Sequence, residues 1–509
     1  MLLSEVVKIT APSSFKLMED REILGLCYDS RQIVTGGLFF ALKGASSDGH
    51  RFIDAAVKAG AVAVVLEDES RAPATATWFK VEDARVAMAL VAGEYYGNPT
   101  QMLKTVGVTG TNGKTTTTYL IESVMEAAGI PTAVMGTVAY RFAGKNIPAP
   151  HTTPESVELQ KILREMTDMG AKGVAMEVSS HALEQHRVDA CLFDVGIFTN
   201  LTREHLDYHG DMEGYFGAKA RLFSELLDPV RGKKNCRAVI NMDDPYGERM
   251  AEAAVCPVIS FGVENTADVR AEGVTFTADG ITGALVTPQG SAGFASALVG
   301  RFNLANILGA VATGIALDFP LRKIVAGIES AKKVPGRLER VNNELGITVL
   351  VDYAHTGDAL DNVLRTIRDV AEGRLITVFG CGGDRDPGKR PVMGALAARY
   401  SDLTIVTSDN PRTEDPHAII AQIVGGIRPL GVEEFAAADL IEGFAGKGYT
   451  VIESRSEAIK TAVNAARKGD ILLLAGKGHE DYQIIGTEKH HFDDREEASR
   501  ACVARGKDS

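Results

Sequence analysis

The sequence predicts an α/β protein of three domains, and three observations support this fold class. A length of 509 residues corresponds to about three domains at ~100–200 residues each. Short apolar and β-branched runs alternate with helical patterns, which indicates parallel sheets covered by helices. Glycine supplies 52 of the 509 residues, about one in ten, which is above the usual share of ~7%. Many of these glycines stand in loops that directly follow a strand.

The first hundred residues are expected to form a small α/β domain. Apolar runs at 36–42 and 61–66 predict buried strands, and the segment 54–59 between them predicts a helix. The turn-rich segment 95–101 (YYGNPTQ) marks the end of this domain. We therefore place the first domain at residues 1–100.

Residues 101–336 are expected to form a central domain around a parallel sheet. A β-branched run at 105–109 leads into a glycine-rich loop and a helix at 114–128. Residues 257–300 indicate antiparallel hairpins, and a helix is expected at 300–317. The segment 334–337 (VPGR) marks the boundary. Further strands of the parallel sheet are expected at 133–135, 173–178, 194–199 and 238–241.

Residues 337–509 are expected to form a Rossmann-like domain. Four strand-like runs each end in a polar or glycine-rich loop, namely DYAHTGD, GCGGDRD, SDNPRTED and GKGHED. Ligands of parallel α/β sheets bind beyond the carboxyl ends of the strands. The four loops therefore predict one functional edge. The strands are expected at 348–352, 375–379, 403–407 and 470–475.

Composition and charge exclude several classes of function. The net charge of −13 opposes general binding to nucleic acid. No run approaches 18 apolar residues, so no membrane span is expected, and the N-terminus does not read as a signal peptide. The six cysteines are widely spaced, which is typical of reduced cysteines in a cytoplasmic protein. We expect a cytoplasmic monomer.

The segment VGVTGTNGKTTTT at 106–118 has the order of a phosphate-binding loop. Glycines let backbone N–H groups turn toward phosphates, the lysine neutralises them, and the hydroxyl after it can bind Mg²⁺. The common pattern requires glycine at position 108, where this chain has Val108. The candidate phosphate-binding residues here are Gly110, Thr111, Asn112, Gly113, Lys114, Thr115 and Thr116.

Two further segments offer metal ligands. Glu177 stands near the end of an expected strand, where its carboxylate suits Mg²⁺. His205 and His209 are four residues apart, but a zinc protease would need glutamate at position 206, where this chain has Leu206. His209 alone is best interpreted as an ordinary, hydrogen-bonded histidine.

Lys219 shares one helical face with apolar side chains in YFGAKARLF. The residues alone favour a side chain that extends its amine to the surface. The alternative is a buried amine, whose lowered pKa favours the neutral form. A neutral amine can react with CO₂ to give a carbamate, which is an anionic metal ligand.

The loop GTNGKTT, with its shifted glycine, resembles the ATP-binding loop of the Mur ligase family, the ADP-forming ligases of peptidoglycan precursors. The resemblance covers the chain in order and implies a UDP-binding N-terminal domain, a central ATPase domain and an amino-acid-binding C-terminal domain. It implies ATP as substrate and two Mg²⁺ ions, with Thr115, Glu177, His205 and Lys219 as metal ligands, His205 at the second ion and Lys219 as N6-carboxylysine. It implies catalytic roles for Lys114, Glu177, His205 and Lys219, and further ATP contacts at Asn306, Arg337, Asp352 and His355.

Other segments resemble the contacts that family members make with UDP-N-acetylmuramoyl-L-alanyl-D-glutamate. The chain departs from a close relative at His151, where that relative has asparagine. The residues concerned are Ser30, Ala45, Ser46, Ser47, His151, Thr152, Thr153, Ser179, Gln185 and Arg187.

The loop DNPR at 409–412 indicates which amino acid is added. A guanidinium grips a carboxylate with two hydrogen bonds, and meso-diaminopimelate carries a second carboxylate that lysine lacks. Asp409 offers a carboxylate for an ammonium group. The loop matches family members that add meso-diaminopimelate, and the matching contacts are Arg385, Asp409, Asn410, Pro411, Arg412, Gly476 and Glu480.

Alternative functions remain within and outside the family. The chain could add D-alanyl-D-alanine or make folylpolyglutamate, but DNPR and the His-Thr-Thr-Pro segment at 151–154 oppose both. A GTPase would need an N-K-x-D motif, which is absent from the sequence. An inactive scaffold would be expected to lose Lys114, Glu177 or Lys219, and all three are present. His205 and His355 are both candidates for the base that accepts the amine proton, and the sequence does not decide between them.

Overall fold

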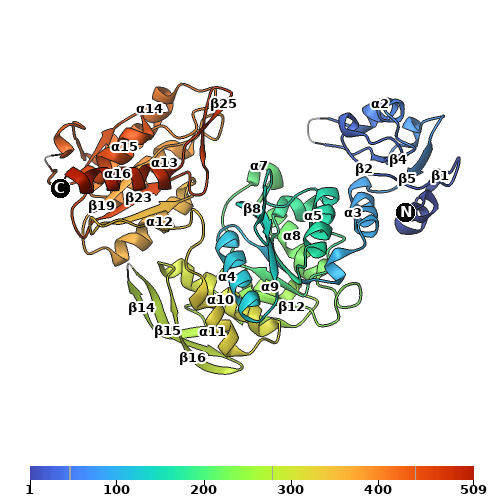
Figure 1. Ribbon diagram of the computed structural model, residues 1–509, viewed down its shortest axis with the longest axis horizontal. Helices are drawn as coiled ribbons and strands as arrows, with labels where there is room; N and C mark the ends of the chain where they lie inside the picture. The colour runs from blue at the N-terminus through green and yellow to red at the C-terminus, as the bar shows by residue number, and fades with distance from the viewer. Residues whose placement is uncertain (45–46, 278, 442, 509) are drawn as a thin grey trace. The chain divides into compact units, whose positions relative to one another are not determined.

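The computed structural model describes residues 1–44, 47–277, 279–441 and 443–508 (Figure 1). The chain divides into two compact units. The first comprises Met1–Arg270, Thr287–Gly290 and Leu308–Gly327, and the second comprises Ala271–Val286, Ser291–Ile307 and Ile328–Ser509. Three large sheets confirm the predicted α/β class. The boundaries at residues 100 and 336 stay predictions.

The N-terminal sheet has the strand order β1-β5-β4-β3-β2, and only β1 runs antiparallel to its neighbour. Alternate residues of β3 and β4 face opposite sides of the sheet. Phe40 and Val65 pack with α1 and α3, whereas Phe39 and Val64 pack with α2. The elements are α1 Leu3–Thr10, β1 Ser14–Lys16, β2 Leu26–Cys27, β3 Leu38–Phe40, α2 Ile53–Lys58, β4 Ala63–Leu66, β5 Thr77–Lys80 and α3 Ala84–Tyr95.

The central sheet has eight strands in the order β13-β12-β11-β6-β10-β7-β8-β9. The strands from β13 to β7 are parallel, and the hairpin β8–β9 extends one edge antiparallel. The strands are β6 Lys104–Thr109, β7 Thr132–Met135, β8 Ala139–Phe142, β9 Lys145–Pro148, β10 Gly173–Glu177, β11 Val195–Phe198, β12 Arg237–Asn241 and β13 Val258–Phe261. The helices of this region are α4 Lys114–Ala127, α5 Ser156–Asp168, α6 Ser180–Glu184, α7 Leu206–His209, α8 Met212–Arg221 and α9 Gly247–Ala253.

The hairpins expected at 257–300 require one correction. β13 belongs to the parallel sheet, where Ala238 to Asn241 pair with Val258 to Phe261. It lies at the edge of that sheet beside β12, where Phe261 is buried and Val258, Ile259 and Ser260 are half-buried. The remaining strands form a separate sheet in the order β14-β15-β16 (yellow in Figure 1). They are β14 Arg270–Thr277, β15 Gly280–Thr287 and β16 Gly290–Ser296, followed by α10 Arg301–Ala316 and α11 Leu321–Ser330.

The C-terminal sheet has the order β17-β18-β23-β19-β20-β22-β21, with only β17 antiparallel. One face packs on α12, α13 and α14, and the other packs on α15 and α16. Helices on both faces of a parallel sheet confirm the Rossmann-like layering. The strands are β17 Glu339–Val341, β18 Thr348–Asp352, β19 Leu375–Phe379, β20 Leu403–Val406, β21 Glu433–Glu434, β22 Gly448–Val451 and β23 Ile471–Ala475. The remaining elements are α12 Gly357–Val370, α13 Lys389–Tyr400, α14 Pro416–Ile427, α15 Arg455–Ala465, β24 Tyr482–Ile485, β25 Glu488–His491 and α16 Asp494–Asp508.

All six cysteines are buried thiols without disulfide bonds, as the spacing predicts. Cys381, in the GCGG loop, lies 3.8 Å from the sulfur of Met393. Burial raises the pKa of the Cys381 thiol to about 12, which fits a packing role. No helix in the described ranges has the length and hydropathy needed to cross a membrane.

Candidate functional site

The phosphate-type loop connects the end of β6 to the start of α4, and two of its positions require glycine. Gly110 and Gly113 have φ angles of 149° and 86°, a region that favours glycine. A Cβ atom on Gly110 would lie 1.9 Å from Thr199 Oγ1. The loop backbone is therefore held against β11 at a distance that no other residue allows.

Lys114, the first residue of α4, lies over this loop. Its Nζ donates hydrogen bonds to Gly110 O at 2.9 Å and to Thr111 O at 2.8 Å. The amine and the N-terminus of a helix of 14 residues both carry positive charge at the same end. Such an arrangement attracts an anion such as phosphate.

Glu177 ends β10, the strand directly beside β6. Its carboxylate is buried and accepts hydrogen bonds from Thr115 Oγ1 at 2.9 Å and from Thr137 N and Oγ1, both at 3.0 Å. A Cβ atom on Gly136 would lie 2.2 Å from Glu177 Oε1. The glycine therefore makes room for the carboxylate beside the phosphate-type loop.

The residues around Glu177 fit Mg²⁺. The hydroxyl of Thr115 and the carboxylate of Glu177 are hard oxygen donors that already lie within 2.9 Å of each other. Mg²⁺ is usually held by one or two carboxylates, with water and phosphate oxygens completing its shell. Among the residues that the structure describes, no three His, Cys, Asp or Glu side chains lie together as a metal site.

Lys219 is buried, with 1% of its surface exposed, so the buried alternative is correct and the extended amine that the residues alone favour is wrong. Its Nζ donates to Gly110 O at 2.9 Å and lies 4.4 Å from the centroid of the Tyr215 ring. Burial, with a contribution from Lys114, lowers the pKa of Lys219 well below its usual range. The helix α8 places this amine at the loop because the buried face of α8 also holds Tyr215.

A cluster of aromatic rings lies next to Lys219. The rings of His181 and His205 are 5.0 Å apart, and His209 lies 5.1 Å from Tyr215. His209 Nε2 lies 2.9 Å from Ser180 Oγ and Nδ1 lies 2.8 Å from Glu184, which confirms the interpretation of His209 as an ordinary bonded histidine. Burial and the neighbouring histidines lower the pKa of His181 to about 4.

Four of the residues that resemble the family's contacts with UDP-N-acetylmuramoyl-L-alanyl-D-glutamate, called here the dipeptide nucleotide, lie around the end of β10. Thr153 Oγ1 donates to Glu177 O at 2.9 Å and accepts from Ser179 N at 3.1 Å. Arg187 donates to Thr153 O at 2.9 Å and to Gln185 Oε1 at 2.7 Å. The structure thus brings Thr153, Ser179, Gln185 and Arg187 together with the candidate metal ligand.

The other residues of that set are placed less closely. Thr152 Oγ1 lies 3.1 Å from Thr137 Oγ1, and His151 accepts a hydrogen bond from Tyr140 through its carbonyl. Ser30 begins a short turn that Asp29 caps, and Ser47 O accepts from Gly44 N at 2.9 Å. Ala45 and Ser46 lie outside the described residues.

The candidate ATP residues of the second unit surround the end of β18. Asp352 is buried and accepts hydrogen bonds from Leu338 N and Ala354 N, both at 2.8 Å. The guanidinium of Arg337 lies 5.1 Å from the Tyr353 ring. His355 Nδ1 lies 2.8 Å from Tyr353 O.

Asn306 lies on α10. Asn306 Nδ2 donates to Asn303 Oδ1 at 3.0 Å, and Asn303 Nδ2 donates to Val299 O at 2.8 Å. The two amides therefore face the same side of the helix. The expectation that Asn306 contacts ATP stays a prediction.

The DNPR loop includes a buried ion pair that sequence reasoning missed. Lys477 Nζ lies 3.0 Å from Asp409 Oδ1 and donates to Asn410 Oδ1 at 3.1 Å and to Tyr482 O at 2.8 Å. The Lys477 side chain is fully buried. The position of a lysine between two glycines at the end of β23 was the available signal. Asp409 is therefore already paired with a cation.

Arg412 and Arg385 come from neighbouring strand-end loops. Arg412 has a φ of 51° and its Nη1 donates to Gly383 O at 2.7 Å. Gly383 N donates to Asn410 O at 2.9 Å, which joins the loop that bears Arg385 to the loop that bears Arg412. A second residue missed from sequence, Arg390, reinforces this junction, because it pairs with Glu414 through two bonds of 2.8 Å.

Glu480 approaches the same edge from the GKGHED loop. Its Oε2 accepts from Asn410 Nδ2 at 3.0 Å. Burial, with the nearby charge of Asp409, raises the pKa of Glu480 above its usual range. Gly476 has a φ of 114°, and a Cβ there would lie 3.5 Å from Asp409 Oδ2. Three of the four loops that were expected at one edge meet here, and the fourth is joined to them because Gly476 N donates to Asp352 O at 3.0 Å.

Comparisons with known protein families match most of the chain. Residues 22–96 match the Mur ligase family catalytic domain, residues 108–314 match the Mur ligase middle domain, and residues 336–478 match the Mur ligase glutamate ligase domain. The order of the three matches follows the order of the three large sheets.

Curated relatives match over almost the full length. A protein of Geobacter metallireducens is 63% identical and one of Geobacter sulfurreducens is 62% identical, each over 98% of both chains. Both bear the name UDP-N-acetylmuramoyl-L-alanyl-D-glutamate–2,6-diaminopimelate ligase. A solved structure with the same name is 34% identical, covers 99% of both chains and superimposes with a TM-score of 0.71.

Proposed function

Because the chain belongs to the Mur ligase family, we propose that this ligase joins meso-diaminopimelate to the γ-carboxylate of D-glutamate in UDP-N-acetylmuramoyl-L-alanyl-D-glutamate. One observation carries the proposal, namely the 63% identity over 98% of both chains to a relative of that name. The product would be a precursor of peptidoglycan.

The proposed reaction proceeds through an acyl phosphate. A carboxylate resists attack by an amine, so an oxygen of the γ-carboxylate first attacks the γ-phosphorus of ATP, and ADP leaves. The amine nitrogen of diaminopimelate then attacks the carbonyl carbon. The C–O bond to phosphate breaks, inorganic phosphate leaves and an amide forms. Neither His205 nor His355 is assigned as the base that accepts the amine proton.

The first compact unit supplies the proposed phosphate site. We propose that the loop from Gly110 to Thr116 binds the phosphates through backbone N–H groups, and that Lys114 transfers its hydrogen bonds from loop carbonyls to phosphate oxygens. Thr115 and Glu177 would hold one Mg²⁺ and His205 a second, and these ions would neutralise charge on the phosphoryl group. Asn306, Arg337, Asp352 and His355 are the proposed ATP contacts of the second unit.

We propose that Lys219 is carbamylated. Its Nζ would attack the carbon of CO₂ and lose a proton, which gives an anionic ligand at the same loop. Two observations support this step. The side chain is excluded from water, and its amine reaches the carbonyl of Gly110. Glu177, at the other side of the loop, faces Thr115.

The dipeptide nucleotide is proposed to bind in the first unit. The guanidinium of Arg187 donates to Thr153 O, and the hydroxyl of Thr153 bonds with Ser179 through its backbone N–H and its hydroxyl, at the end of β10. Arg187 also pairs with Glu155 at 2.8 Å, so an acidic substrate bound here would compete with Glu155 for the guanidinium. The other proposed contacts are Ser30, Ala45, Ser46, Ser47, His151, Thr152 and Gln185.

The amino acid is proposed to bind at the strand-end loops of the C-terminal sheet. Arg412 and Arg385 would recognise a carboxylate, and Glu480 an ammonium group. Asp409 pairs with Lys477, so we propose that it acts by holding Lys477 and Asn410 in place. Pro411 and Gly476 shape the loop backbone. A reaction that consumes ATP and uses residues of one chain fits a cytoplasmic monomer.

Phosphate release tests the proposal. The full-length protein, with ATP, Mg²⁺ and UDP-N-acetylmuramoyl-L-alanyl-D-glutamate, is expected to release phosphate with meso-diaminopimelate and at least about tenfold more slowly with L-lysine, a difference of ~1.4 kcal/mol. Equal rates would refute the role of Arg412. No release with any amino acid, D-alanyl-D-alanine included, would favour an inactive scaffold.

A further inference from the structure

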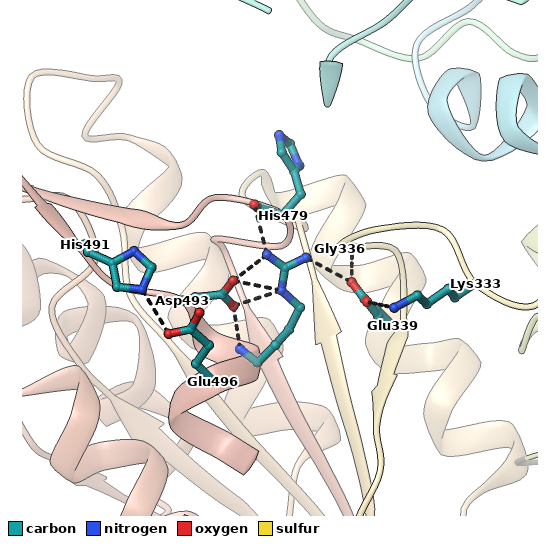
Figure 2. A network of polar contacts seen from close by, with 8 residues as sticks. Lys333, Gly336, Glu339, His479, His491, Asp493 and Glu496 are labelled. Carbon is teal, nitrogen blue, oxygen red and sulfur yellow. Dashed lines mark hydrogen bonds and ion pairs between the residues drawn. The ribbon is translucent and has the colours of Figure 1, made fainter. Parts of the chain in front are cut away.

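A polar network organises the segment 333–339, which contains Arg337 (Figure 2). Glu339 is buried, and its Oε2 accepts a hydrogen bond from Gly336 N at 2.9 Å. Its Oε1 lies 3.4 Å from Lys333 Nζ. On the other side of Arg337, Leu338 N donates to Asp352 at 2.8 Å. The backbone of Arg337 is therefore fixed from both sides.

Arg495 connects this segment to the loop 476–480. Its Nη1 donates to Glu339 Oε2 at 3.3 Å and its Nη2 donates to His479 O at 3.3 Å. Asp493 holds the guanidinium with bonds of 2.8 Å and 2.5 Å. A planar guanidinium with five donors suits a bridge between three partners. One side chain thus joins segments more than 130 residues apart.

Two glycines bring the same segments into direct backbone contact. A Cβ atom on Gly336 would lie 2.1 Å from His479 N, and a Cβ on Gly478 would lie 2.9 Å from Gly336 O. Tyr353 N also donates to Gly336 O at 2.9 Å. This backbone contact does not depend on Arg495, and it places the segments 333–339 and 476–480 directly against each other.

We propose that Glu339 and Arg495 are positioning residues that couple the loop 476–480 to Arg337, so that an amino acid bound at Glu480 fixes the position of Arg337. The inference rests on the proposed function, since it assumes an amino acid at this loop. Arg337 would then be ordered for its role with ATP only when the second substrate is present. Coupling between two sites commonly amounts to ~5–150-fold in affinity.

Hydrogen exchange of the full-length protein tests this coupling. The protein is studied with β,γ-methylene-ATP, Mg²⁺ and the dipeptide nucleotide, with and without meso-diaminopimelate. In the wild type, the amino acid is expected to slow exchange at least about fivefold in both 476–480 and 333–339. In Glu339→Gln, it is expected to slow exchange only in 476–480. Arg495→Gln interrupts the network from its other end and is expected to behave like Glu339→Gln.

Arg340→Gln is the matched control, because it removes an exposed ion pair with Asp279 one residue from Glu339. It is expected to behave like the wild type. The inference is overturned if both Glu339→Gln and Arg495→Gln still transmit the effect to 333–339, or if 333–339 never responds while 476–480 does. No response at 409–412 and 476–480 in the wild type would overturn the proposed substrate, and the inference with it.

Discussion

His479 is expected to make the second unit lose stability in acid. The side chain lies against the Tyr353 ring, with centroids 5.0 Å apart. Burial lowers the pKa of His479 to about 4, and the charges of Arg337 and Arg495 act in the same direction. Replacing it by glutamine removes the titrating group while keeping a polar side chain. The wild type and His479→Gln are therefore expected to differ in how their stability depends on pH.

The sign and size of the effect follow from the two pKa values. Histidine in an unfolded chain has a pKa of ~6.5, so between this value and about 4 the unfolded chain binds more protons. Stability therefore rises with pH in this window. The contribution of His479 is present above about pH 6.5 and is lost as the pH falls toward 4. Between pH 7.5 and pH 4.5 the loss is about 2.5 kcal/mol.

The assay is the free energy of opening of β23, measured by hydrogen exchange at both pH values. The loss of stability on acidification is expected to be about 2.5 kcal/mol smaller in His479→Gln than in the wild type. His490→Gln, at a half-exposed side chain of β25, serves as the control and should keep the wild-type loss. An equal loss in His479→Gln and the wild type would refute the reasoning.

Four further substitutions have defined outcomes. Lys219→Ala should reduce phosphate release at least about 100-fold, or ~2.7 kcal/mol, with partial rescue by short carboxylic acids, and full activity without rescue would contradict carbamylation. Arg412→Lys should raise KM for meso-diaminopimelate at least about tenfold, because lysine lacks the planar fork; an unchanged KM argues against the contact. Asp494→Ala leaves the buried Arg455 without the partner at 2.6 Å and should cost ~3–5 kcal/mol in thermal unfolding, whereas a cost below about 1 kcal/mol would exclude a buried charge. Gly336→Ala should lower the unfolding temperature of the protein more than Gly469→Ala, because both glycines have positive φ but of the two only Gly336 is crowded. Equal unfolding temperatures would show that the backbone at His479 shifts without cost.

Much of the fold could be predicted because the parallel strands are buried on both faces. Continuous apolar runs such as those of β19 and β23 stand out from their surroundings. The strands at the sheet edges were harder to predict. β13 has mostly half-buried residues, and the hairpin β8–β9 is short, with Ala143 and Gly144 both at positive φ. Such a turn favours a hairpin, but alanine at its first position conceals the signal.

The candidate site was predictable where chemistry is local in sequence and less so where partners come from distant segments. The phosphate-type loop is one contiguous stretch. By contrast, the burial of Lys219 depends on Tyr215 and the loop packing together, and the pairing of Lys477 with Asp409 joins the ends of β23 and β20. Periodicity places a side chain on a face but does not say how deeply that face is covered.

The distribution of the buried thiols makes the protein its own reporter of unfolding. Cys27, Cys191, Cys236 and Cys256 belong to the first compact unit, and Cys381 and Cys502 belong to the second. A thiol reagent reacts with the exposed thiolate, and burial suppresses that form. The labelling rate of each cysteine therefore measures how often its surroundings open, so mass spectrometry of one labelled sample can follow the opening of both units separately.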